Sequence, residues 1–164
     1  MKTYRKLALS VIGFILVSGT AFGAGFQSFS SESSAATQAL NCRNSKVTPA
    51  SYGMGALYGC IQGKAETVKW FINEIPDTGR VENIKLMWND WFKNIGYGLH
   101  ADKREAEKAL EALIQMYAPQ KASEVQQTFW ANSNKTIESD GFVLKYTYSR
   151  GPSIDERLIV VTSK

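Results

Sequence analysis

Apolar residues in the middle of the chain recur at spacings of three and four, which is the pattern of an amphipathic helix. In KAETVKWFINEI, residues 64–75, the stripe consists of Val68, Phe71, Ile72 and Ile75. In VENIKLMWNDWFKNI, residues 81–95, it consists of Ile84, Met87, Trp88, Trp91 and Ile95, widened by Leu86 and Phe92. Pro76 and Gly79 break the pattern between the two stretches. We therefore predict two helices here.

Two further helices are predicted downstream. In residues 103–118 a stripe of Ala106, Ala109, Leu110, Leu113 and Tyr117 faces inward, with glutamates and lysines outside. Asp102 precedes it as an N-cap, and Pro119 ends it. Residues 122–133 predict a short helix, and the small and aromatic residues from Pro49 to Gly63 are also compatible with a helix, although glycine disfavours one.

The pattern changes near the end of the chain to one typical of strands. Phe142, Leu144, Tyr146 and Tyr148 alternate with polar residues, and ERLIVVT, residues 156–162, follows a Gly-Pro turn. This arrangement predicts a β-hairpin. Because a lone hairpin is marginal in water, we expect its apolar face to lie on the helices. The predicted fold class is α+β: three to four helices, a C-terminal hairpin packed on them and one disulfide.

The first residues predict export. Lys2, Arg5 and Lys6 precede an uncharged apolar run, and small residues follow, as in a secretory signal peptide. We expect cleavage after Gly23, with Ala21 as the alternative. An uncleaved anchor is disfavoured because the run is shorter than the ~20 residues that a spanning helix needs. We expect a signal peptide at 1–23, a flexible serine-rich lead-in at 24–40 and one globular domain at 41–164, without a membrane span after cleavage.

The charge of the mature chain argues against nucleic-acid binding. The chain has 19 basic and 15 acidic residues, a net charge of +4. Three of the bases and none of the acids lie before residue 24, so the mature chain is nearly neutral. A protein that binds DNA or RNA needs a basic face that displaces counterions from phosphates.

Cys42 and Cys60 are the only cysteines, and in an oxidising compartment two such thiols most often pair. A redox or nucleophilic thiol is the alternative. Neither cysteine has a Cys-x-x-Cys partner or a nearby histidine, so we predict a structural disulfide.

Little else in the sequence predicts chemistry. One histidine and scattered carboxylates make no metal site, and the glycine pairs continue into no phosphate-binding fingerprint, so we expect no metal and no cofactor. His100 could act with a serine and Asp90 or Asp102, but no serine lies in a nucleophile elbow. The carboxylate pairs Glu74 with Asp77 and Asp155 with Glu156 are further candidates for hydrolysis. We expect the protein not to be an enzyme.

The richest cluster of aromatic residues is LMWNDWFKNIGYGLH, residues 86–100. Its helical spacing predicts that most of it is core. Large indoles are seldom fully buried, and the turn that follows could form a rim. The candidate partner-binding residues are Trp88, Trp91, Tyr97, His100 and Trp130, each of which core packing would also explain.

The stretch NCRNSKVTPASYGMGALYGCIQGKAE, residues 41–66, resembles the Rap/Tai-type immunity proteins. These exported bacterial proteins neutralise toxins delivered by type VI secretion. In that family an early cysteine is followed by an aromatic-small-Cys-x-x-Gly motif, which Tyr58, Gly59, Cys60 and Gly63 match here, with Cys42 as the partner. The resemblance implies the Cys42–Cys60 disulfide and an immunity role.

These observations lead to one functional expectation and two alternatives. We expect a small periplasmic or secreted protein that binds another protein and occludes it, as an immunity protein or an inhibitor of a toxin or cell-wall enzyme. One alternative is a small secreted hydrolase using His100 or a carboxylate pair. The other is a subunit of an envelope or secretion assembly that pairs through the edge of its hairpin.

Overall fold

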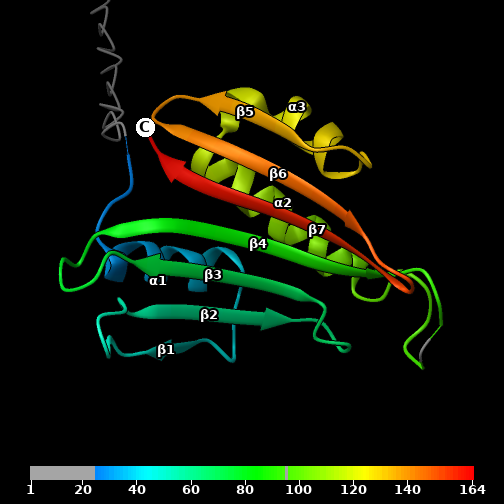
Figure 1. Ribbon diagram of the computed structural model, residues 1–164, viewed down its shortest axis with the longest axis horizontal. Coiled ribbons are helices and arrows are strands. Elements are labelled where there is room, and N and C mark those ends of the chain that lie inside the picture. The colour runs from blue at the N-terminus through cyan, green and yellow to red at the C-terminus, as the bar shows by residue number, and fades with distance from the viewer. Residues whose placement is uncertain (1–24, 95) are drawn as a thin grey trace, which may run out of the picture.

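The computed structural model describes residues 25–94 and 96–164. In these residues seven strands form one antiparallel sheet in the order β1-β2-β3-β4-β7-β6-β5, and three α-helices lie on one of its faces (Figure 1). The helices are α1 Phe29–Ala39, α2 Lys103–Tyr117 and α3 Ala122–Phe129, with a short 3-10 helix, η1, at Pro119–Lys121. The strands are β1 Lys46–Thr48, β2 Leu57–Gln62, β3 Val68–Glu74, β4 Val81–Trp91, β5 Lys135–Ser139, β6 Phe142–Arg150 and β7 Ile154–Ser163.

The fold class predicted from the sequence is wrong, because both stretches with helical spacing are strands of this sheet. The buried residues of β3 and β4 alternate: Val68, Trp70 and Ile72, then Ile84, Leu86 and Trp88. Phe71, Met87 and Trp91 lie on the opposite face, so the apparent spacing of three and four mixes residues from both faces. Ile95, part of the predicted stripe, lies outside the described residues.

The segment after the first cysteine is also not helical. Residues 49–56 form turns, and residues 57–62 form β2. Gly59 belongs to this strand, where the ring of Phe71 crosses it: a Cβ at Gly59 would lie 3.4 Å from Phe71 Cε1. The glycine therefore makes room for an aromatic side chain on the neighbouring strand.

The serine-rich lead-in expected to be flexible contains α1. Ser28 is its N-cap, with a side chain that accepts a hydrogen bond from the backbone N–H of Ser31. Phe29 and Ala36 are buried against the sheet. The apolar periodicity of this segment is too weak to predict the helix, which is stabilised by packing on the sheet. The predicted signal peptide, residues 1–23, lies outside the described residues.

The predictions for the elements further along the chain agree more closely with the structure. The predicted helices at 103–118 and 122–133 correspond to α2 and α3, and β6 and β7 form the predicted antiparallel hairpin. Asp102 precedes α2 but does not cap it with its side chain. Its carboxylate instead accepts hydrogen bonds from the backbone N–H groups of Ala65 and Thr67 in the β2–β3 turn.

The hairpin lies inside the sheet rather than at an edge. β7 pairs with β4 on its other side, and β6 pairs with β5. Both strands of the hairpin are therefore paired on their outer sides, and the edges of the sheet are β1 and β5.

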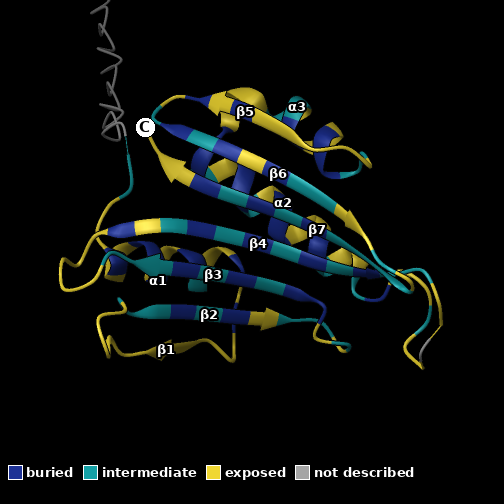
Figure 2. Ribbon diagram, viewed as in Figure 1, coloured by how far each residue is buried: buried dark blue, intermediate teal, exposed yellow. Residues whose placement is uncertain are grey.

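The core lies between the sheet and the helices. Buried and half-buried residues alternate along the central strands (Figure 2). The predicted disulfide is confirmed: Cys42, just after α1, is bonded to Cys60 in β2, and both are buried. The disulfide thus fastens the end of α1 to the sheet.

Candidate functional site

Of the five candidate binding residues, Trp88 belongs to the core and Trp130 is partly buried against it. Trp88 is 1% exposed, and its indole Nε1 donates a hydrogen bond of 3.0 Å to the carbonyl oxygen of Ala101. Trp130 follows α3 and packs edge-to-face against Trp88, with 5.6 Å between the ring centroids. Core packing, the alternative interpretation of the sequence, therefore accounts for Trp88, and Trp130 stays a candidate on its partly accessible side.

The other three candidates lie near one end of the sheet: Trp91, Tyr97 and His100. Together with Leu99 they form what we call the aromatic rim. Trp91 ends β4 and is half-buried, whereas Tyr97 and Leu99 are 56% and 59% exposed. The backbone N–H of His100 donates to the carbonyl of Trp91 at 2.7 Å, which closes the loop between them. Leu99 was missed in the sequence because a lone leucine in a glycine-rich turn gives no signal.

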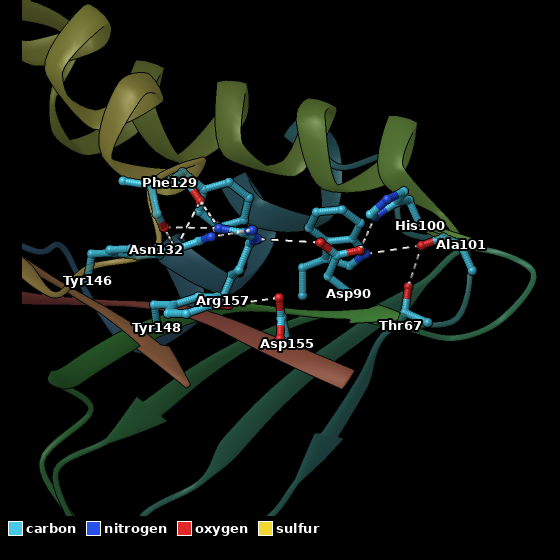
Figure 3. A network of polar contacts seen from close by, with 12 residues as sticks. Thr67, Asp90, His100, Ala101, Phe129, Asn132, Tyr146, Tyr148, Asp155 and Arg157 are labelled. Atoms are coloured by element: carbon cyan, nitrogen blue, oxygen red, sulfur yellow. Dashed lines mark hydrogen bonds and ion pairs between the residues drawn. The ribbon is translucent and has the colours of Figure 1, made fainter. Parts of the chain in front are cut away.

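His100 is held by a buried carboxylate. Its Nδ1 lies 2.6 Å from Oδ1 of Asp90, whose side chain is 7% exposed, whereas the His100 side chain is 54% exposed (Figure 3). Asp90 is on the helix-facing side of β4, and His100 adopts a positive φ of 53°. A histidine in the left-handed region is uncommon and costs free energy. The loop therefore holds His100 in a strained backbone conformation that places its imidazole against Asp90.

Arg157 of β7 forms the other side of a polar cluster, which we define as Asp90, His100, Tyr146, Tyr148 and Arg157 (Figure 3). Its Nη1 donates to the carbonyls of Phe129 and Ala131 and to the hydroxyl oxygen of Tyr146, and its Nη2 donates to Asn132 Oδ1. Its Nε lies 3.6 Å from Asp90 Oδ2. The guanidinium therefore ties the loop after α3 to the sheet and offsets the buried Asp90 charge.

The tyrosines of the cluster have raised pKa values. Burial raises the pKa of Tyr146, although the Arg157 guanidinium acts in the opposite direction. The hydroxyl of Tyr148 donates to Asp155 Oδ2 at 2.8 Å, and this hydrogen bond raises the pKa of Tyr148. Both phenols thus stay protonated near neutral pH and act as hydrogen-bond donors.

The carboxylates of the pairs suggested by the sequence lie at the end of β3 and in the turn that follows it, 74 and 77, and in strand β7, 155 and 156. Glu74 accepts hydrogen bonds from the backbone N–H groups of Ala56 and Gly79, so it stabilises turns. Asp77 is in an exposed turn with a positive φ. Asp155 and Glu156 are consecutive in β7 and therefore point to opposite faces of the sheet. Of the sequence-based catalytic candidates, the structure joins only His100 and Asp90.

The second feature is the face of the sheet that points away from the helices, which we call the open face. In the described part of the chain no helix lies on it (Figures 1 and 2). Its apolar side chains are partly accessible, and Ile61 is 44% exposed. They are Leu57, Ile61, Phe71, Met87, Leu158 and Val160.

Lysines interrupt these apolar residues. The register places Lys46, Lys69, Lys85 and Lys145 on the open face. None of the four forms an ion pair within residues 25–94 and 96–164. At one end of this face, Trp91 of the aromatic rim pairs with Ile154 of β7. The open face and the rim are therefore continuous.

The described residues contain no group of three or more His, Cys, Asp or Glu that could hold a metal ion. Among the same residues, no helix is both long and apolar enough to cross a membrane. Comparisons with known proteins gave no match to a family model, to a curated protein or to a solved structure. The resemblance to the Rap/Tai-type immunity proteins stays a prediction.

Proposed function

We propose that the protein binds another protein through its open face and the adjoining aromatic rim. The observation that carries this proposal is the apolar open face itself, which nothing in the described residues covers. A sheet normally buries its apolar face against another layer, and accessible apolar side chains gathered on one face and bordered by polar residues are typical of interaction sites. The rim adds Trp91 and Tyr97, and tryptophan and tyrosine are common anchors of protein interfaces.

The proposed mechanism is steric occlusion of a partner in the bacterial envelope or outside the cell. A rigid, disulfide-fastened sheet loses little conformational entropy on binding, which favours tight association. The Cys42–Cys60 disulfide is itself typical of exported proteins. The partner would be a toxin, a cell-wall enzyme or another envelope component, and the first of these corresponds to the immunity role that the sequence resemblance implies.

The test compares capture by matched variants of the mature, oxidised protein. In Phe71→Asp/Met87→Asp, charge is placed at the centre of the open face, whereas in the control, Tyr52→Asp/Met54→Asp, it is placed on two exposed apolar residues of the β1–β2 loop. Quantitative mass spectrometry of envelope fractions should find one stoichiometric partner with the wild type and the control. The open-face variant should lose that partner while its circular dichroism spectrum stays native. Undiminished capture by the open-face variant would contradict the proposal.

The 2.6 Å contact between His100 and Asp90 favours a second candidate function, hydrolysis. With Nδ1 occupied by a buried carboxylate, the exposed imidazole can accept a proton at Nε2, as a general base does. It would take a proton from water as the water oxygen bonds to an acyl carbon, and Asp90 would stabilise the resulting imidazolium. The leaving group would depart with the proton returned by Nε2.

Hydrolysis is tested with a panel of esters, amides and cell-wall fragments. Any activity should fall at least ~100-fold in His100→Ala, the range that loss of a general base produces. Trp91→Ala serves as the control for a change in the rim that leaves the His100–Asp90 pair in place. Activity that survives His100→Ala, or no turnover by the wild type across the panel, would exclude this function.

A further inference from the structure

We propose that the surface bound by the open face is acidic, with carboxylates set against a row of lysines. This inference rests on the proposed function, because it names the chemistry of the partner for the same face. The lysine row consists of Lys46, Lys85 and Lys145, with Lys69 beside it in the next row of the sheet.

The register of the sheet creates the row. Lys46 lies opposite Gly59, Gly59 opposite Phe71, and Phe71 opposite Lys85. The row continues from Lys85 to Val160 of β7 and from Val160 to Lys145 of β6. With about 4.8 Å between neighbouring strands, the lysines are about 14 Å and about 10 Å apart along the row.

The charge of this row is not balanced on the same face. Glu138 points to this side but pairs with Lys164 at 3.1 Å. Glu156 is the other carboxylate of the face, and it lies opposite Asn89, two residues along β4 from Met87. Among the described residues whose face the strand pairing assigns, four lysines without ion pairs therefore share the open face with one carboxylate that is free of ion pairs. A nearly neutral mature chain thus has a basic open face.

The apolar residues between the lysines determine what the partner surface must present besides carboxylates. The ring of Phe71 crosses Gly59 and forms a platform between Lys46 and Lys85. Val160 lies between Lys85 and Lys145, and Met87 and Leu158 follow in the next row. A matching partner therefore presents apolar or aromatic side chains flanked by aspartates or glutamates. Opposite charges on the two surfaces would speed association and exclude basic competitors.

The shape of the face favours a protein over an anionic membrane. Proteins that bind membranes through apolar groups bury them about 5–10 Å into the headgroup boundary. Here Phe71, Met87 and Val160 are half-buried, whereas Lys46 and Lys145 at the two ends of the row are exposed. Such a face fits a surface whose own side chains protrude.

The test uses three capped seven-residue peptides that alternate phenylalanine with glutamate, serine or lysine. Each is titrated into the ¹⁵N-labelled mature protein, and the backbone amide shifts are mapped. The glutamate peptide should shift amides of β3, β4, β7 and β6, and its Kd should rise several-fold between 50 and 300 mM NaCl, because salt screens exposed charges.

A matched pair of lysine variants locates the effect. Replacing Lys46, Lys69, Lys85 and Lys145 by glutamine should weaken binding of the glutamate peptide about tenfold. In the control variant, glutamine replaces four lysines that are exposed away from the open face: Lys64, Lys103, Lys108 and Lys121. This change should alter the Kd of the glutamate peptide less than twofold. Equal loss in both variants would show a general charge effect and overturn the inference.

The remaining outcomes separate this inference from the proposed function. If the serine and lysine peptides bind the open face as tightly as the glutamate peptide, the partner is not acidic, although the face still binds. If shifts map to α2 and α3, or no peptide shifts the open face, the proposed function fails too. Binding of the protein to anionic phosphatidylglycerol vesicles, with no response to any peptide, would identify a membrane surface instead and overturn the inference.

Discussion

His100 is oriented by Asp90, and this single contact fixes which ring nitrogen carries the proton. A buried carboxylate can only accept from Nδ1, so the neutral imidazole must be protonated at Nδ1 and leave Nε2 without a proton. We expect the ¹⁵N chemical shifts of this side chain above pH 8 to show that tautomer. Because His100 is the only histidine in the chain, a long-range ¹H–¹⁵N correlation spectrum gives an unambiguous answer.

Asp90→Asn provides the comparison for the tautomer. Its amide can offer either an oxygen or an NH₂ group, so the two tautomers should become mixed. A wild-type spectrum dominated by the Nε2-protonated form would contradict the geometry and remove the basis for a general base at this position.

Tyr117 gives a second residue-scale prediction, on the dependence of stability on pH. Its hydroxyl donates to Glu32 at 2.7 Å, and burial, followed by the Glu32 charge, raises its pKa well above the usual value. In the unfolded chain tyrosine loses its proton near pH 10. The stabilisation is therefore complete below about pH 10, and it is lost above that pH because only the unfolded chain releases the proton.

We expect the free energy of unfolding to fall above pH 10 by about 1.4 kcal/mol per pH unit for this residue. Tyr117→Phe should flatten that slope and lower the stability at pH 8, since Glu32 loses a buried donor. The measurement is urea denaturation between pH 8 and pH 11.5. Tyr52→Phe, at a fully exposed side chain, should keep the wild-type slope; an unchanged slope in Tyr117→Phe would contradict the assignment.

At the scale of elements, the sequence predicted the hairpin of β6 and β7 but failed at β3 and β4. β6 alternates cleanly, and its hairpin with β7 was predicted. In β3 and β4 the open face adds Phe71, Met87 and Trp91 to the buried set, which creates false helical spacing. The error thus has the same physical origin as the proposed binding surface.

The link between α1 and β2 gives a prediction at this scale. The Cys42–Cys60 disulfide closes a loop with a sequence separation of 18, which stabilises the folded chain by about 3 kcal/mol on the chain-entropy estimate. Cys42→Ser/Cys60→Ser should lower the free energy of unfolding by about that amount. Urea denaturation of the double variant and of the reduced wild type should agree, and a loss below about 0.5 kcal/mol would show that the loop is held by other contacts.

For the whole molecule, the candidate binding surface depends on register and could not be predicted from the sequence. Lys46, Lys85 and Lys145 are far apart in the chain and share no motif. Only the order β1-β2-β3-β4-β7-β6 sets them in one row. The sequence also did not predict that Arg157 lies beside Asp90, the carboxylate that contacts His100. Of the aromatic candidates, spacing alone could not separate the buried Trp88 from Trp91, because they lie on opposite faces of one strand.

The lysine row also predicts the association state of the isolated protein. Like charges on two copies disfavour stacking of one open face on another, so replacing two of them should permit it. We expect Lys85→Leu/Lys145→Leu to self-associate in sedimentation velocity at concentrations where the wild type does not. Lys103→Leu/Lys108→Leu, on α2, is the control, and a monomeric open-face variant would show that these two charges do not govern self-association.

The central position of β7 has a consequence for the order in which the chain can fold. β7 is the last described strand in the sequence, yet it joins the β1–β4 half of the sheet to the β6–β5 half. When only the first 150 residues have left the ribosome, the strand that joins β4 to β6 is not yet present. The nascent polypeptide therefore cannot complete this sheet until Ile154–Ser163 has been synthesised, and a truncation that removes β7 would leave two separate fragments of sheet, each with an unpaired edge.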